Sequence, residues 1–270
     1  MDGPILITGC SSGIGAAAAR DLVARGHTVY ATARGPVDIE GARTLALDVT
    51  DPEQAAAAVR QIEAEHGAIG ALVNNAGYGI SGAVEAVSLD IFRRVFETNA
   101  IGYMRMAQLV LPGMREAGRG RIVNVGSVAG RVTMPGAGPY SATKFAIRAL
   151  NDALRFEVKG LGIDVVLVEP GPIRTQFTTT ANTSFPEDAP AAYADFHTAV
   201  AKADAEADAS SLAGDAEDVA KAIRRALEAR RPKALYRVTF VARLLPTLRG
   251  LLGERGWDAF LRTQAPAPKR

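Results

Sequence analysis

The start of the chain combines a short apolar segment, a glycine-rich loop and an alanine-rich stretch. Residues 4–8 read as a buried strand, and the alanine-rich stretch to about residue 25 reads as a helix. Between them, Gly9, Gly13 and Gly15 have the spacing G-x-x-x-G-x-G. Such glycines permit a tight turn, close approach of the backbone to a phosphate, and a pyrophosphate held at the helix N-terminus. A glycine loop can also be a simple turn, but the flanking strand and helix favour dinucleotide binding.

The same alternation of strand and helix continues along most of the chain. Further strands are predicted at residues 28–33, 44–48, 121–126, 163–169 and 234–239, and residues 72–77 are predicted to form another strand together with the loop that follows it. Helices are predicted over residues 51–66, from 89, and over 99–117, 140–161 and 215–230. This pattern predicts an α/β fold with a doubly wound parallel sheet that binds ligands at the carboxyl ends of its strands. A length of 270 residues, of which 48% are hydrophobic, fits one domain over residues 1–270.

Charge and cysteine content narrow the location and the partners. The formal net charge is +2, so the composition does not indicate nucleic-acid binding, although residues 230–270 are basic. The single cysteine, Cys10, excludes an internal disulfide and suits a reducing cytosol. The first strand pattern begins at residue 4, which leaves no room for a cleavable signal, and no apolar run reaches the roughly 18 residues of a membrane span. We therefore expect a cytoplasmic protein.

The residue after the second predicted strand bears on the choice of dinucleotide. An acidic residue at the end of that strand would accept hydrogen bonds from the 2′-hydroxyl of an adenosine ribose. This chain has Ala33 followed by Arg34 instead, which favours a 2′-phosphate and hence NADP. The alternative is an ordinary surface arginine in a loop.

Tyr140 and Lys144 form a candidate proton-handling pair at the start of a predicted helix. Residues four apart lie on one helical face, so both side chains can point into one cleft. A general acid or base near neutral pH needs a phenol pKa about three units below its ordinary value, or roughly 4 kcal/mol of phenolate stabilisation. A nearby ammonium is a plausible source of that shift. The pair alone is weak evidence, since the alternative is a half-exposed aromatic beside a solvated lysine.

Two segments near the end of the chain lack the regular pattern. Residues 176–214 lose periodicity and are expected to form a long loop that covers the substrate. The basic amphipathic extension over residues 240–270 mixes leucines with arginines. It could pack on the core, meet another subunit or make weak contact with a membrane surface.

Taken together, these motifs resemble the short-chain dehydrogenase/reductase family. The resemblance covers residues 4–175 strongly and rests on the order and spacing of the glycine loop, residues 74–77, Asn99, Ser127, Tyr140 with Lys144, and residues 170–171. It implies a single Rossmann-type domain with strand order 3-2-1-4-5-6-7. It also implies a homodimer or homotetramer joined through the helices after Asn99 and Tyr140.

The resemblance also implies roles for individual residues. Tyr140 would be the acid/base, Lys144 would lower its pKa and bind the nicotinamide ribose, Ser127 would orient the substrate oxygen, and Asn99 would help hold a water relay. The implied cofactor-binding residues include Tyr140 and Lys144 and otherwise come from the loops after the strands: Gly9, Ser11, Ser12, Gly13, Ile14, Gly15, Arg34, Asp48, Val49, Asn75, Ala76, Gly77, Pro170, Gly171, Ile173 and Thr175.

The function predicted from this resemblance is an NADP(H)-dependent oxidoreductase that interconverts a carbonyl and an alcohol. Residues 29–34, 140–145 and 169–175 are similar to the branch that contains 17β-hydroxysteroid and retinol dehydrogenases, which favours a lipophilic small-molecule substrate. A non-catalytic NADP-binding sensor or scaffold is the alternative.

Other reactive residue types do not indicate a further site. Cys10 is expected to be a small loop residue, and His27 and His197 lack any partner at a spacing that suits a metal site or the activation of a nucleophile. The sequence shows neither a metal-ligand cluster nor a Ser/His/Asp arrangement.

Overall fold

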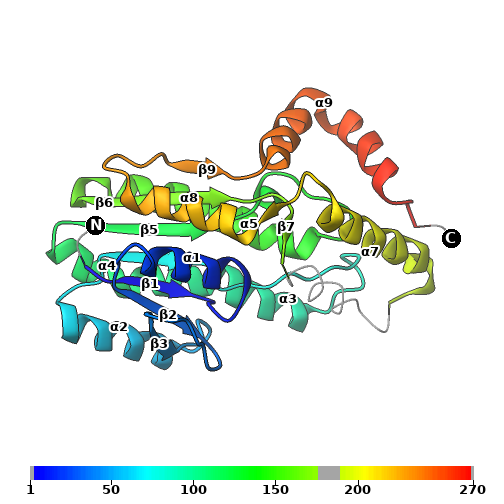
Figure 1. Cartoon of the computed structure of the whole chain (residues 1–270). Coiled ribbons are helices and arrows are strands. Elements are labelled where there is room, and N and C mark those ends of the chain that lie inside the picture. Colours follow the sequence, from blue (N-terminus) through cyan, green and yellow to red (C-terminus); the bar gives the residue numbers. More distant parts are fainter. Residues whose placement is uncertain (1–2, 176–188, 269–270) are drawn as a thin grey trace.

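A seven-stranded parallel sheet forms the centre of the molecule (Figure 1). The computed structural model describes residues 3–175 and 189–268. The strand order is β3-β2-β1-β4-β5-β6-β9, and every pairing is parallel. The predicted single domain, its doubly wound topology and its strand order are therefore confirmed. The strands are β1 (Ile5–Thr8), β2 (Val29–Ala33), β3 (Arg43–Ala46), β4 (Ala71–Asn74), β5 (Gly120–Val125), β6 (Ile163–Glu169) and β9 (Leu235–Arg237).

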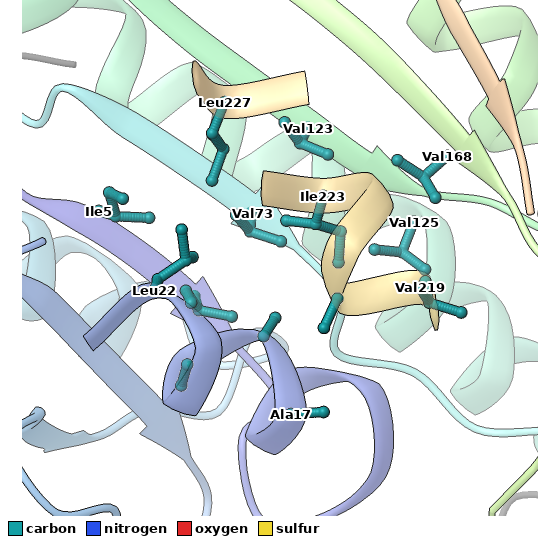
Figure 2. Close-up of a cluster of buried hydrophobic side chains, with 14 of the residues drawn as sticks. Ile5, Ala17, Leu22, Val73, Val123, Val125, Val168, Val219, Ile223 and Leu227 are labelled. Atoms are coloured by element: carbon teal, nitrogen blue, oxygen red, sulfur yellow. The ribbon is translucent and has the colours of Figure 1, made fainter. Parts of the chain in front are cut away.

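Helices cover both faces of the sheet. On one face, α1 (Gly13–Val23) packs beside α8 (Ala216–Glu228), and Figure 2 shows their apolar side chains meeting those of the strands. On the other face lie α2 (Pro52–His66), α4 (Gly102–Glu116) and α5 (Gly138–Glu157). Successive strand residues point to opposite faces, so Ile5 and Ile7 pack with Ile223, while Leu6 packs with Ile62. Burial on both faces explains the continuous apolar strand patterns.

The helix before α4 differs from the prediction. Residues 89 and 99 were expected to begin separate helices, but α3 (Leu89–Phe96) continues through a π-helical segment, Glu97–Ile101, directly into α4. Asn99 therefore lies inside a helical run rather than at the start of one. A π-helical turn inserts an extra residue without ending the helix, and such turns occur frequently at functional sites.

The segment predicted as one long loop, residues 176–214, is helical in part. Within its described portion, Ala191–Tyr193 forms a 3₁₀ turn that leads into α7 (Ala194–Ala209). Alanine has the highest intrinsic helix propensity, so this stretch forms a helix although its apolar residues lack a clear period. β8 (Gly214–Asp215) then pairs with β7 (Ile173–Arg174) in a small second sheet that the sequence did not predict. Residues 176–188 of the predicted loop lie outside the described residues.

The last helix, α9 (Phe240–Gln264), is bent and extends from the end of β9 (Figure 1). Gly253 interrupts it with a φ of 63°, a backbone conformation that residues other than glycine rarely adopt. Ala242 and Trp257 are buried, whereas Phe240, Leu244 and Leu251 are exposed. No helix within the described ranges combines the length and the apolar composition that crossing a membrane requires.

Candidate active site

The glycine loop between β1 and α1 forms a cradle for an anionic group. Gly9 has a φ of 75°, and a Cβ added at Gly15 would collide with the carbonyl oxygen of Gly9. Asn75 holds this turn, because its Nδ2 donates to the carbonyl oxygens of Thr8 and Gly9 at 3.0 Å each. Ser12 occupies the N-cap position of α1 but makes no capping bond through its side chain. The first N–H groups of a helix have no intrahelical partners, so they suit a diphosphate here.

The carboxyl end of β1 also positions the loop after β4. The hydroxyl of Thr8 accepts hydrogen bonds from the backbone N–H groups of Asn75 and Ala76, each at 3.0 Å. A Cβ at Gly77 would lie 2.9 Å from Oδ1 of Asn99, so the loop needs glycine to approach that side chain. These contacts bring the predicted cofactor residues of two strand ends side by side.

Asn99 is fully buried and uses its amide to hold that loop. Its Oδ1 accepts from the backbone N–H of Tyr78 at 3.0 Å, while its Nδ2 donates to the Tyr78 carbonyl oxygen at 2.9 Å and to the Thr143 hydroxyl at 3.3 Å. The two bonds to Tyr78 imitate a backbone pair. The side chain of Asn99 therefore joins the π-helical segment, the loop after β4 and α5.

Tyr140 and Lys144 lie one helical turn apart on α5, as predicted, and Ser127 follows the end of β5 beside them. Burial raises the pKa of Tyr140, and a hydrogen bond with the Ser127 hydroxyl opposes that rise. The expected lowering of the Tyr140 pKa is thus not produced by the chain's own side chains, because desolvation dominates. The ammonium nitrogen of Lys144 lies 5.7 Å from the centre of the Tyr140 ring.

Lys144 is itself in an unfavourable place for a charge. It is 5% exposed, and burial lowers its pKa to about 7. Its Nζ donates to the carbonyl oxygen of Val125 at 3.1 Å, and the Tyr103 hydroxyl donates to the same oxygen at 3.2 Å. Lys144 can therefore gain or lose a proton near neutral pH.

The remaining predicted cofactor residues line the same edge of the sheet. Arg34 follows β2 and is exposed. Asp48 accepts from the backbone N–H and the hydroxyl of Thr50, at 2.9 and 2.7 Å, and the neighbouring Val49 is buried. These bonds fix the loop after β3 next to the end of β2.

Residues 170–175 reach from β6 back to the glycine loop. The Pro170 carbonyl oxygen accepts from the Val128 N–H at 2.8 Å, next to Ser127. Gly171 faces Thr239, whose hydroxyl a Cβ there would strike, and Ile173 is buried within the small sheet. Thr175 lies beside the glycine loop, since a Cβ built on Gly13 would be 3.5 Å from its methyl group; Ser11 and Ile14 belong to the same loop.

The helix α7 and the 3₁₀ turn before it are tied to the loop that follows β4. Nε2 of His197 accepts from the backbone N–H of Ala83 at 3.0 Å, and the Tyr193 hydroxyl bonds to Glu85 at 2.5 Å. His197 thus has a structural contact that its sequence context did not predict, and burial lowers its pKa.

Cys10 in the glycine loop is not a reactive cysteine. Burial raises its pKa to about 12, so it lacks the thiolate character that reactivity requires.

Comparison with known proteins identifies the family. A family model described as short chain dehydrogenase matches residues 4–185. The chain belongs to this family. Its members are oxidoreductases that bind a nicotinamide cofactor and small-molecule substrates. The predicted family and the coarse function are confirmed.

Individual relatives of this short-chain dehydrogenase span most of its length. It is 35% identical over 270 residues to the uncharacterized oxidoreductase YbbO of Escherichia coli K12, covering 97% of the chain and 94% of the relative. It is 44% identical over 181 residues to the 3-ketodihydrosphingosine reductase of Bacteroides thetaiotaomicron, covering 67% of each.

Solved structures agree with the fold. The TM-score is 0.79 against a short-chain dehydrogenase from Streptomyces avermitilis, at 33% identity, covering 96% of this chain and 97% of that one. It is 0.76 against the closed form of serine dehydrogenase complexed with NADP+, at 26% identity, covering 88% and 95%.

Tyr103 is a site residue that the sequence analysis missed. It is buried, its ring centre lies 5.5 Å from Nζ of Lys144, and it shares the Val125 carbonyl with that lysine. Its position four residues after Asn99 was the available signal, because residues at that spacing share a helix face. The π-helical turn between them could not be read from the sequence.

Proposed function

We propose that the chain is an NADP(H)-dependent oxidoreductase that interconverts a carbonyl and an alcohol on a lipophilic substrate. Examples of such a substrate are a steroid ketone, a retinoid aldehyde, or a similar ketone or aldehyde. The observation that carries the proposal is the cluster of half-buried Ser127 and Tyr140 with the buried Lys144, beside a glycine cradle suited to a dinucleotide. The 44% identity to a 3-ketodihydrosphingosine reductase supports an apolar carbonyl substrate.

The proposed roles follow from the chemistry of each group. When bound, the dinucleotide supplies or receives a hydride at its nicotinamide ring. Tyr140 gives its proton to the substrate oxygen in reduction and takes it back in oxidation, and its raised pKa keeps the phenol protonated for the first of these. Ser127, already bonded to Tyr140, orients the same oxygen. Lys144 and the relay around Asn99 restore the proton.

The proposed cofactor-binding roles rest on how well the residues at the carboxyl ends of the strands fit a dinucleotide. The cradle of residues 9–15 would hold the diphosphate, and residues 75–77 would line the cofactor beside it. Asp48 and Val49 would meet the adenine, and residues 170–175 the nicotinamide carboxamide. Pro172 has no N–H to donate, so that part of the contact falls to its neighbours.

The preference for NADP(H) rests on Arg34. Its exposed guanidinium after β2 can pair with a 2′-phosphate in a bidentate manner. The NADP+ complex of serine dehydrogenase supports this cofactor in a related structure. We expect Arg34→Asp to shift the ratio of kcat/KM values toward NADH by about tenfold or more, as expected for one lost charge-assisted contact. An unchanged ratio would contradict the assignment.

The decisive assay follows nicotinamide absorbance with NADPH and NADH against ketosteroids, retinal, aliphatic aldehydes and quinones. We expect turnover of at least one lipophilic class with NADPH. Tyr140→Phe should remove most of that turnover and leave NADPH affinity near normal, whereas Tyr236→Phe, far along the chain, serves as the control. NADPH binding without turnover of any class would favour the non-catalytic sensor, and a fully active Tyr140→Phe variant would remove the acid/base role.

An oligomer is part of the proposal. Ile101 at the end of the π-helical segment, Met104 on α4 and Phe156 on α5 are exposed apolar side chains in the helical segments through which we expect subunits to join. Their burial against a second copy would form a homodimer or homotetramer. Light scattering after size exclusion measures the state directly, and a monomer at all concentrations would contradict this part.

A further inference from the structure

A cleft separates the second half of α9 from the connection between β5 and α5. Its volume is about 740 Å³, within the range of small-molecule sites. The helix α9 bends at Gly253 (Figure 1), and residues on both sides of the bend line the cleft. The cleft is therefore formed by two segments that are more than a hundred residues apart in the chain.

The walls of the cleft are largely apolar. Val132 and Met134 line it from the loop after β5, and Phe145 lines it from α5. Trp257 and Leu261 face them from α9. Trp257 is 4% exposed, so the apolar wall is well fixed on the α9 side. Surfaces of this kind favour a hydrocarbon chain.

The polar part of the lining is mainly cationic. Among the described lining residues, Arg131 and Arg249 are basic and Glu254 is acidic. Arg249 lies over the Trp257 ring at 5.8 Å, at the edge of the apolar wall. It pairs with Glu254 at 2.5 Å, but that carboxylate is 84% exposed. Exposed ion pairs contribute little, so Arg249 can exchange this partner for a ligand anion at small cost.

An excess of arginine lies behind the same wall. Arg131 donates to the buried carboxylate of Glu169 at 2.6 Å, and Arg148 donates to its other oxygen at 2.7 Å. Arg237 lies 3.7 Å from that carboxylate as well. This connected network joins four arginines to two acids: Arg131, Arg148, Arg155 and Arg237 with Asp152 and Glu169. The resulting positive potential favours an anion at the cleft.

We propose that this cleft binds a single-chain amphiphile with an anionic head group. The hydrocarbon chain lies against Met134, Phe145, Trp257 and Leu261, and the head group pairs with Arg249. The charge excess is what selects an anionic occupant over an uncharged chain. The test of this proposal measures ligand binding and needs no hydride transfer. The proposal can therefore fail while the proposed oxidoreductase function holds, and the reverse is also true.

Trp257 provides a direct readout, since it is the single tryptophan of the chain. The full chain is titrated with sodium dodecanoate below its micelle concentration, and Trp257 emission is followed. We expect a saturable change in this emission, and about tenfold weaker binding of the methyl ester, the effect of one charge-assisted hydrogen bond. Arg249→Gln should bring dodecanoate affinity down to that of the ester. Arg255→Gln, an exposed arginine outside the cleft lining, should leave it unchanged.

Charge reversal makes the test independent of a mere loss of folding. Arg249→Glu should weaken dodecanoate binding further and give saturable binding of dodecyltrimethylammonium, which the unmodified chain should bind weakly. Equal affinities for the carboxylate and the ester, or a response that never saturates, would overturn the proposal. So would an emission shift produced by raising the protein concentration alone, which would show that a second copy fills the cleft.

Discussion

Replacing Lys144 by methionine should change how the stability of the protein depends on pH. Lys144 is buried with a pKa of about 7, whereas an unfolded chain holds the lysine proton up to its ordinary pKa near 10.4. Between these values the unfolded state binds more protons, so this residue makes the free energy of unfolding rise with pH. Methionine removes the titrating group. The Val125 carbonyl keeps the Tyr103 hydroxyl as a hydrogen-bond donor at 3.2 Å.

The size of the effect follows from the two pKa values. Integrating proton release between about pH 7 and pH 9 gives a gain of about 2 kcal/mol from Lys144. Higher pH is less informative, because burial raises the pKa of Cys10 to about 12 and raises those of Tyr103 and Tyr140. Those groups retain protons in the folded state and lower stability as pH rises. Cys10 already opposes the gain toward pH 9, because an unfolded thiol loses its proton near pH 8.5, so the difference between the unmodified chain and Lys144→Met isolates Lys144.

Urea unfolding at several pH values, at one protein concentration and without nucleotide, measures the effect. The unmodified chain should gain stability between about pH 7 and pH 9, and Lys144→Met should lose that gain. Relative to the unmodified chain, Lys144→Met should be most stabilised at the acidic end of this range. Lys233→Met, an exposed lysine, is the matched control and should retain the gain. A Lys144→Met profile parallel to that of the unmodified chain would refute the link between burial and the low pKa.

Three further substitutions test the cradle, the core and a helix cap. Gly15→Ala places a Cβ against the Gly9 carbonyl and should weaken NADP(H) binding by about tenfold or more, measured by nucleotide fluorescence; unchanged affinity would contradict the close packing. Ile223→Ala empties a fully buried site between α8 and the sheet and should cost about 2–5 kcal/mol in urea unfolding. Asp51→Ala removes the bonds to the backbone N–H groups of residues 53 and 54 and should cost about 1 kcal/mol, while Asp38→Ala in a loop should cost less.

Features set by local chemistry could be predicted from the sequence. Asp51 and Pro52 begin α2, as expected for a capping residue followed by a proline in the first turn. Tyr140 and Lys144 share a face of α5 because a helix fixes that geometry. The strands were found because apolar runs on both faces of a parallel sheet are long enough to stand out.

Contacts between elements distant in the sequence could not be predicted. Asn99 bonds to Tyr78 only because a π-helical turn brings it to the loop after β4, and no local pattern announces that turn. The arginines around Glu169 come from three different elements, so their convergence depends on the assembled sheet. The error over α7 has a different reason, because its alanines favour a helix by intrinsic propensity without producing an apolar period.

The location of the site is also indicated by the positions at which otherwise apolar strands carry buried polar residues. Thr8, Asn74 and Glu169 are the last residues of β1, β4 and β6, and each is at most 1% exposed. A buried polar group costs free energy unless it is hydrogen-bonded, so apolar residues there would be the simpler choice for stability. Instead, Thr8 holds the loop after β4, Asn74 bonds to Asn124 of the next strand, and Glu169 binds arginines. Polar residues are concentrated at the edge where the cradle and Lys144 lie, because the loops there must be held in fixed positions around a ligand.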